Sequence, residues 1–332
     1  GIEYLTRLAI TLGNFDTTDL NNIDYETYLY IDTLEVYDGI IYEGSLYNIS
    51  TLGVNTELRL IDLLYTINDI SDINKFKNLQ DLYLPAQCIS DISPILYKDT
   101  LGDLDFSNNP ILDFSVLNDI KVSRYIIVGY FYYQFSYLNQ NYSTDLKTSS
   151  TDLENYRKFS TTLNKIFSII HNVINENITD KMNRSEKLEV INNWIISNIK
   201  YDYEYLKYGD YRMTTLYTAQ NPKLAPSSLE RAILDGYGIC SGYTDVFSIF
   251  CDILKIPCIA IGDYAFNGES IESHAWNLVE LEDGKLYHID STWNCASNDY
   301  FLVSDEEIKT DHFWDPDSIQ GSFNYKKECI PY

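Results

Sequence analysis

Cys240 lies in the glycine-rich segment DGYGICSGY, directly before an apolar stretch with the periodicity of a helix. A cysteine in this place would begin the helix, where free backbone N–H groups and the positive end of the helix dipole stabilise a thiolate. The thiolate is the nucleophilic form of cysteine, and the same N–H groups could hold an oxyanion while it attacks a carbonyl. Taken alone, Cys240 is interpreted equally well as a small buried residue, so a partner base has to decide between the two.

The neighbouring cysteines lack that placement. Cys251 falls about three turns into the same helix on its apolar side, and Cys258 follows Pro257 at the start of a strand. Both are best interpreted as small buried residues. The six cysteines contain no CxxC pair, so we expect no metal and no cofactor, although a metal-binding domain and one or two disulfides stay open.

A partner base has to be sought among only four histidines. His171 lies in a helical segment remote from Cys240, and His312 is near the end of the chain. His274 in SHAWNLVEL and His288 in KLYHIDST lie on two candidate strands that the tripeptide EDG joins. Strand geometry can choose between these two histidines.

The turn between the strands decides which side chains share a face. In a three-residue loop, Glu282–Gly284, the glycine takes the left-handed position and Leu281 pairs with Lys285. His274 and Asp290 then lie on one face as diagonal neighbours, within reach of a hydrogen bond. A two-residue loop would put them on opposite faces. We therefore expect the three-residue loop, with His274 beside Asp290.

His288 would share that face but lie farther along it, and we expect it to be structural or at the rim. The same register puts Trp276 opposite Asp290 on the shared face. Together, Cys240, His274 and Asp290 have the residue types of a nucleophile, a base and the acid that orients the base.

The residues that carry this chemistry resemble a known superfamily. GYGICSGYTDVFSIFCDILKIPCIAIGD, HAWNLVEL and KLYHIDSTWN are similar to the transglutaminase-like domain in its bacterial form, and the resemblance runs roughly from Lys187 to the C-terminus. It implies Cys240 as nucleophile, His274 as catalytic histidine and Asp290 as orienting aspartate. One departure is Lys255, which stands where the family usually has glycine.

The resemblance implies an acyl transfer on an amide bond of a protein or peptide substrate. Cys240 would attack the carbonyl to form a thioester. Water would then complete the reaction of a protease, amidase or deamidase, whereas an amine would complete that of a cross-linking transglutaminase. Trp276, Tyr243 and Trp293 belong to the motifs and would line or support the acyl pocket.

The first third of the chain contains an internal repeat. The segments LTRLAI, IDTLEV, LRLIDL, LQDLYL and LGDLDF follow one another at intervals of 26, 27, 21 and 22 residues. This period and pattern are typical of a leucine-rich repeat, in which each L-x-L is a short strand with one buried face. An ordinary β-rich domain with coincidental spacing is the alternative.

We therefore expect an α+β chain with three parts. Residues 1–125 form a leucine-rich-repeat solenoid, and residues 126–150 form a capping and linker segment. Residues 151–332 form the transglutaminase-like (papain-like) domain, in which a helix bearing the cysteine packs on an antiparallel sheet. A long loop after Tyr201 is a further candidate for function.

Charge and hydropathy limit the partners. The net charge of −25 repels nucleic acid and favours a neutral or basic partner. No apolar run is long enough for a transmembrane segment. By resemblance to exported proteins of Gram-positive bacteria, we expect a secreted or cell-surface protein whose repeats bind a protein ligand. The alternative function is a non-catalytic, adhesin-like surface protein that uses only the repeats.

Overall fold

The computed structural model describes a defined part of the chain. The described residues are 7–11, 33–37, 41–42, 45–46, 57–60, 68–71, 73, 81–85, 87–97, 101–113, 115–120, 122–130, 133–138, 150–203 and 229–329. The chain divides into two compact units, Gly1–Thr161 and Thr162–Tyr332. Most of the loop predicted after Tyr201 lies outside the described residues.

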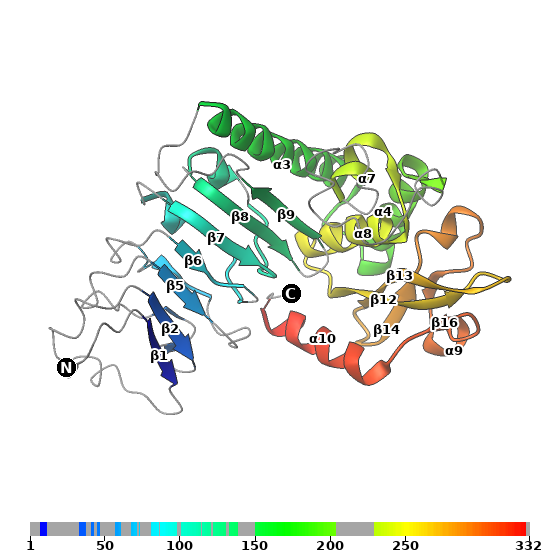
Figure 1. Cartoon of the computed structure of the whole chain (residues 1–332). Helices are drawn as coiled ribbons and strands as arrows, with labels where there is room; N and C mark the ends of the chain where they lie inside the picture. The colour runs from blue at the N-terminus through cyan, green and yellow to red at the C-terminus, as the bar shows by residue number, and fades with distance from the viewer. Residues whose placement is uncertain are drawn as a thin grey trace, which may run out of the picture. The chain divides into compact units, whose positions relative to one another are not determined.

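The first unit contains a seven-stranded sheet (Figure 1). Its strands are parallel from the first to the sixth, and the last one pairs antiparallel. In spatial order they are β1 (Arg7–Thr11), β2 (Thr33–Tyr37), β5 (Glu57–Leu60), β6 (Asp81–Tyr83), β7 (Leu101–Ser107), β8 (Val122–Tyr130) and β9 (Tyr133–Leu138). Shorter elements of this unit are β3 (Ile41–Tyr42), β4 (Ser45–Leu46), η3 (Ser93–Tyr97) and η4 (Ser115–Asn118).

A buried asparagine ties successive strands of this sheet together. The Asn109 side chain donates to the carbonyl of Leu84 at 2.8 Å and to that of Phe106 at 3.2 Å. Its Oδ1 accepts from the backbone N–H of Ile89 at 3.1 Å. These hydrogen bonds pair backbone groups of two consecutive turns that would otherwise stay unpaired in the core. The repeats themselves stay a prediction, because most of the segments between the strands lie outside the described residues.

Helices of the second unit gather around α8. The long helix α3 (Ser150–Asn177) contains the division between the units, and α4 (Arg184–Asn198), α7 (Leu229–Asp235) and α8 (Cys240–Ile253) follow. Helix α4 begins with a reciprocal cap, because Asn183 accepts from the N–H of Glu186 and Glu186 accepts from the N–H of Asn183. Helix α8 contacts both α4 and α7 (Figure 1) and is buried along most of its length.

The sheet of the second unit has five antiparallel strands. In spatial order they are β15 (Phe301–Val303), β14 (Leu286–Ile289), β13 (Ile271–Glu280), β12 (Cys258–Phe266) and β16 (His312–Phe313). Helix α8 packs on β12 and β13, as the sequence predicts for the cysteine-bearing helix. The remaining elements are the paired strands β10 (Lys200–Tyr201) and β11 (Tyr237–Gly238), η6 (Trp293–Cys295), α9 (Asp305–Ile308) and α10 (Pro316–Cys329).

The turn between β13 and β14 has the predicted form. Gly284 adopts φ 75°, in the left-handed region that favours glycine, and the N–H of Leu281 donates to the carbonyl of Lys285 at 3.2 Å. The ladder continues with Leu278 opposite His288. The predicted register is therefore confirmed, and it fixes which side chains of β13 and β14 share a face.

A buried ion pair secures the end of α8 that is farthest from Cys240. Lys326 of α10 and Asp252 of α8 form this pair, and they are only 2% and 1% exposed. Removing one partner of such a pair leaves an uncompensated buried charge, which is strongly destabilising. Helix α10 therefore holds the C-terminal end of the helix that begins with Cys240. Cys251 and Cys258 are both buried nearby, as predicted.

No helix of the described residues is both long and apolar enough to cross a membrane.

A residue with a strained backbone follows the C-cap of helix α8. Lys255 adopts φ 58°, a conformation that L-residues rarely take, and the N–H of Ile256 closes the helix by donating to the carbonyl of Cys251 at 2.9 Å. This geometry explains why glycine suits the position at which the resemblance expects it. The structure accommodates lysine there at a cost in backbone strain.

We expect Lys255→Gly to raise the free energy of unfolding by about 0.5–1 kcal/mol relative to Lys255→Ala, because only glycine relieves the left-handed strain. Urea denaturation of the three proteins measures this difference. Lys255→Ala is the matched control, since it removes the same side chain and keeps the strain. Equal midpoints for the two variants would show that the backbone at Lys255 is not strained.

Candidate active site

Cys240 is the first residue of α8. Ile239 precedes the helix in an extended conformation, with φ −95° and ψ −176°, and its side chain makes no capping hydrogen bond. Isoleucine is a poor N-cap, so no side chain of the cap competes for the N–H groups of the first turn. The strand β11 leads into this position and pairs with β10, which fixes the approach of the chain to the helix.

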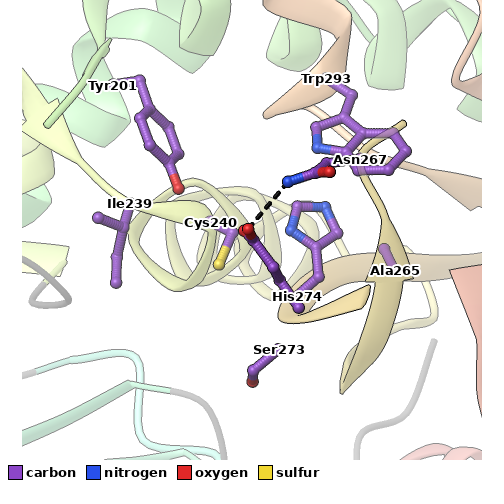
Figure 2. Close-up of a pocket in the computed structure, with 9 residues that line it drawn as sticks. Tyr201, Ile239, Cys240, Ala265, Asn267, Ser273, His274 and Trp293 are labelled. Atoms are coloured by element: carbon purple, nitrogen blue, oxygen red, sulfur yellow. Dashed lines mark hydrogen bonds between the residues drawn. The ribbon is translucent and has the colours of Figure 1, made fainter. Parts of the chain in front are cut away.

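The Cys240 sulfur faces a small cleft of about 70 Å³. Figure 2 shows the sulfur between the side chains of Tyr201 and His274. The lining residues are Tyr201, Ile239, Cys240, Ala265, Asn267, Glu272, Ser273, His274 and Trp293. Cys240 is half-buried, so a substrate can reach the thiol.

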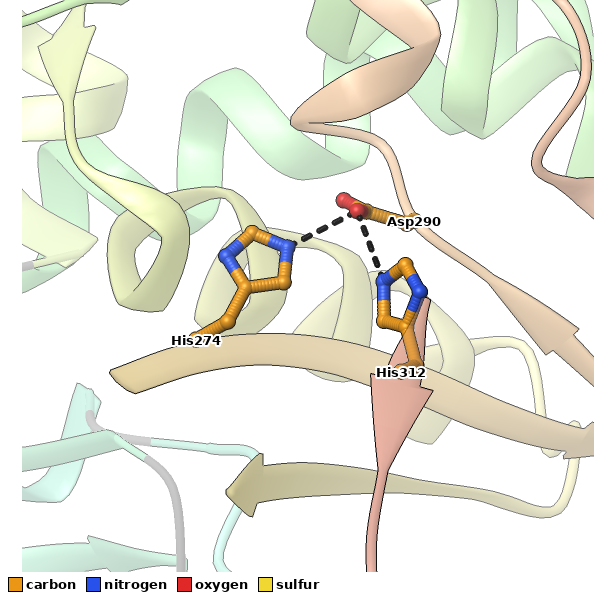
Figure 3. Close-up of side chains that lie close together, drawn as sticks. All are labelled: His274, Asp290 and His312. Carbon is orange, nitrogen blue, oxygen red and sulfur yellow. Dashed lines mark hydrogen bonds and ion pairs between the residues drawn. The ribbon is translucent and has the colours of Figure 1, made fainter. Parts of the chain in front are cut away.

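His274 lies between Cys240 and Asp290. Its Nε2 donates to Asp290 Oδ2 at 2.8 Å, and the ring is 8% exposed (Figure 3). Cys240 lines the same cleft as His274. Burial lowers the pKa of His274, but the charge and hydrogen bond of Asp290, and to a smaller extent Cys240, raise it to about 10. The imidazole is therefore held as an imidazolium at neutral pH.

Asp290 is fully buried directly after β14. Its Oδ1 accepts from the backbone N–H groups of Thr292 at 2.9 Å and Trp293 at 3.1 Å. Burial raises the pKa of Asp290, but His274 and, to a smaller extent, His312 outweigh it and lower the pKa to about 2. The carboxylate keeps its charge at every pH at which the protein would work.

Two tryptophans flank the His274 ring. Trp293 stacks on it with centroids 5.0 Å apart and lines the cleft. Trp276 stacks on it at 6.2 Å but is fully buried and is not part of the cleft lining. Of these two motif residues, only Trp293 is placed to touch a substrate.

Tyr243 is also buried away from the cleft. Its hydroxyl donates to the carbonyl of Ile199 at 2.8 Å, and burial raises its pKa. This bond ties α8 to the end of α4, so Tyr243 holds the nucleophile helix in place. The predicted roles of Tyr243, Trp276 and Trp293 toward a substrate stay predictions.

His288 has a structural environment, as the sequence predicts. The ring is buried, its Nδ1 accepts from Trp276 Nε1 at 3.0 Å, and its Nε2 donates to Asp305 Oδ1 at 3.0 Å. Burial lowers the pKa of His288. A neutral ring with one accepting and one donating nitrogen fits both bonds.

His312 lies beside the site, and sequence reasoning missed it, as it missed cleft residues such as Tyr201, Asn267 and Glu272. Its Nε2 lies 3.3 Å from Asp290 Oδ2, the same oxygen that His274 contacts, and its Nδ1 lies 2.6 Å from Asp311 Oδ1. The sequence sets His312 aside because it is near the end of the chain. The one signal that could have pointed to His312 was the segment TDHFW, which lies in the C-terminal part of the resemblance.

His274, Asp290 and His312 have the residue types of a zinc site, and their ligand atoms all lie within 4.8 Å of one another. The same atoms are already matched as hydrogen-bond donors and acceptors, since both histidines contact Asp290 Oδ2. Hydrogen bonding alone therefore accounts for the cluster.

Comparison with known proteins shows which family the site resembles. Residues 172–291 match the family model of the transglutaminase-like superfamily, and this range includes Cys240, His274 and Asp290. This part of the chain is therefore similar to transglutaminase-like domains, whose members are generally cysteine-dependent enzymes. None of the curated proteins matches the chain.

Two solved structures are distantly similar. A TGase crystal structure is 16% identical, with a TM-score of 0.32, over 46% of this chain and 34% of that one. A candidate cysteine protease from Cytophaga hutchinsonii is 20% identical, with a TM-score of 0.29, over 38% of this chain and 37% of that one. The chain thus spans little more than a third of either structure, and neither bears on the function proposed below.

The charge on His274 depends on Asp290, which gives a pH prediction. Because the raised pKa is about 10, we expect His274 to stay protonated from pH 6 to pH 9 and to lose its proton only above that range. In Asp290→Asn the negative charge that raises the pKa of His274 is gone, whereas burial still lowers that pKa. The ring should therefore be neutral at pH 8. Nitrogen-15 NMR of the imidazole, assigned with His274→Gln, distinguishes the two forms. A neutral ring at pH 8 in the wild type would contradict the prediction.

Proposed function

We propose that this protein catalyses thiol-dependent acyl transfer on an amide bond of a protein or peptide, with Cys240 as nucleophile, His274 as base and Asp290 as orienting acid. The observation that carries the proposal is the position of His274, which lines the same cleft as the Cys240 thiol and is hydrogen-bonded to the buried Asp290 carboxylate. The match to the transglutaminase-like superfamily supports the same chemistry.

The proposed reaction begins with the Cys240 thiolate and the His274 imidazolium. The sulfur attacks the amide carbonyl, and the backbone N–H of Cys240 at the start of α8 is placed to stabilise the oxyanion. The C–N bond then breaks as His274 gives its proton to the leaving amine, which produces a thioester. His274 next takes a proton from water or from a second amine, which attacks the thioester; the C–S bond breaks, and the Cys240 thiolate and the His274 imidazolium are restored. Asp290 keeps the imidazole in the required tautomer throughout.

The cleft favours a neutral or basic substrate. Glu272 brings a carboxylate to its rim, where Oε1 accepts from Asn267 Nδ2 at 2.9 Å and from Ser270 Oγ at 2.9 Å. The net charge of −25 acts in the same direction. A lysine side chain near the reacting amide would be attracted, either as an amine acceptor or as a neighbour of the cleaved bond.

The first unit would bind the protein partner. The parallel order of β1, β2, β5, β6, β7 and β8 and the buried Asn109 that joins successive turns support the leucine-rich-repeat interpretation, in which the exposed face of the strands is a binding platform. Secretion or surface exposure rests on the sequence resemblance alone. The alternative is a non-catalytic, adhesin-like protein, which the paired His274 and Asp290 beside a half-buried thiol disfavour.

An activated thiol gives the first test. At pH 6 we expect iodoacetamide to alkylate Cys240 at least roughly tenfold faster than it alkylates glutathione, because the imidazolium of His274 stabilises the thiolate. Rates are followed by mass spectrometry of the Cys240 peptide. Cys295 serves as the slow control within the same sample. The residue is exposed, but partial desolvation by the protein raises the pKa of its thiol. His274→Gln should bring Cys240 down to the rate of a free thiol. A wild-type Cys240 no faster than glutathione would refute the proposed function.

The second test names the reaction. Wild type, Cys240→Ala and Cys295→Ala are incubated with casein and a fluorescent primary amine. Incorporated amine indicates transglutamination, ammonia without incorporation indicates deamidation, and shortened chains indicate proteolysis. We expect one of these products from wild type and Cys295→Ala, and none above background from Cys240→Ala. The same product from Cys240→Ala would exclude Cys240 as the nucleophile.

A further inference from the structure

We propose that His312 is a positioning residue of the active site, which holds the Asp290 carboxylate in the orientation that His274 needs. Figure 3 shows Asp290 between the two imidazoles, with an interaction to each. The inference rests on the proposed function. It assigns a role to a histidine that lies beyond the matched range of the family model, residues 172–291.

His312 is fixed by its place in the sheet. It lies on the edge strand β16, where it pairs with Ala265 of β12, and it is fully buried. Aromatic rings surround it, the two tryptophans edge-on and the tyrosine tilted. Trp293 is 4.6 Å away, Trp276 is 4.8 Å away and Tyr300 is 5.6 Å away between centroids. A ring confined in this way has little freedom to rotate.

Both nitrogens of His312 face carboxylates. Nε2 points to Asp290 Oδ2, and Nδ1 points to Asp311 Oδ1. Asp311 is held in turn, because the Tyr300 hydroxyl donates to its Oδ2 at 2.8 Å. Since Asp311 anchors the far nitrogen, the near nitrogen is presented to Asp290 at a fixed place. A histidine that only filled space would not need an acceptor at each end.

The contact matters because Asp290 has no access to water. Its Oδ1 is satisfied by two backbone N–H groups, whereas its Oδ2 is shared by His274 and His312. Without His312, a buried anionic oxygen would lose one of its donors, and solvent could not replace it easily. The carboxylate could then tilt away from His274, and small displacements of catalytic groups cost large factors in rate.

His288 provides a matched control within the same cluster. It is also fully buried, also bonded to a carboxylate and also packed on Trp276, at 6.5 Å between centroids. Its bonds go to Trp276 and Asp305 and not to Asp290. Replacing His288 should therefore disturb packing to a similar extent without releasing Asp290.

The experiment compares His312→Phe, His312→Gln and His288→Phe. Phenylalanine keeps a ring of similar size and removes both nitrogens, whereas glutamine restores an N–H donor near the position of Nε2. The second-order rate of Cys240 alkylation by iodoacetamide at pH 6 is measured for each by mass spectrometry of the Cys240 peptide. Thermal unfolding is measured in parallel, so that every rate refers to folded protein.

We expect His312→Phe to lower the rate by roughly tenfold or more, and His312→Gln to stay within about threefold of wild type. We expect His288→Phe to keep the wild-type rate even where its melting temperature falls. A wild-type rate in His312→Phe would overturn the inference, as would an equal loss in His312→Phe and His312→Gln. A slow wild-type Cys240 would instead refute the proposed function itself, so the two failures are distinguishable.

Discussion

The structure of the second unit depends on keeping one buried carboxylate charged. Asp290 has no exposed surface, and a carboxylate in that position would normally be protonated or would destabilise the fold. Four donors prevent this, namely two backbone N–H groups and two imidazoles. The elements around Asp290 are placed so that these donors meet at one point, and the charge on His274 follows from that arrangement.

The donors come from parts of the chain that only the tertiary structure brings together. The turn after β14 supplies the backbone N–H groups, β13 supplies His274 and the edge strand β16 supplies His312. Helix α8 then brings Cys240 to the side of His274 away from Asp290. Errors in strand register would break the arrangement, because a shift by one residue moves every side chain to the opposite face. The left-handed glycine at Gly284 thus helps to set the register on which the site depends.

Local rules explain which parts of the site could be predicted. The placement of Cys240, His274 and Asp290 could be predicted because two short-range features fix it. These are the start of a helix after glycine and a hairpin whose loop length decides which side chains share a face. His312 could not be found in this way, since β16 reaches β12 only through a pairing distant in sequence and only two residues long. Periodicity carries no information about such a contact. The tryptophans show the same limit, because the motif contains both Trp276 and Trp293, yet only packing decides that Trp293 lines the cleft.

The edge position of β16 has a consequence for protein synthesis. A ribosome adds residues from the N-terminus, so the thiol at Cys240 is made first, then the base, then the acid, and Asp311 and His312 last. A nascent chain that has completed α8 but not β16 carries a cysteine without its full set of supporting groups. With the roles proposed above, the thiol reaches its full reactivity only after His312 has been added and β16 has paired with β12.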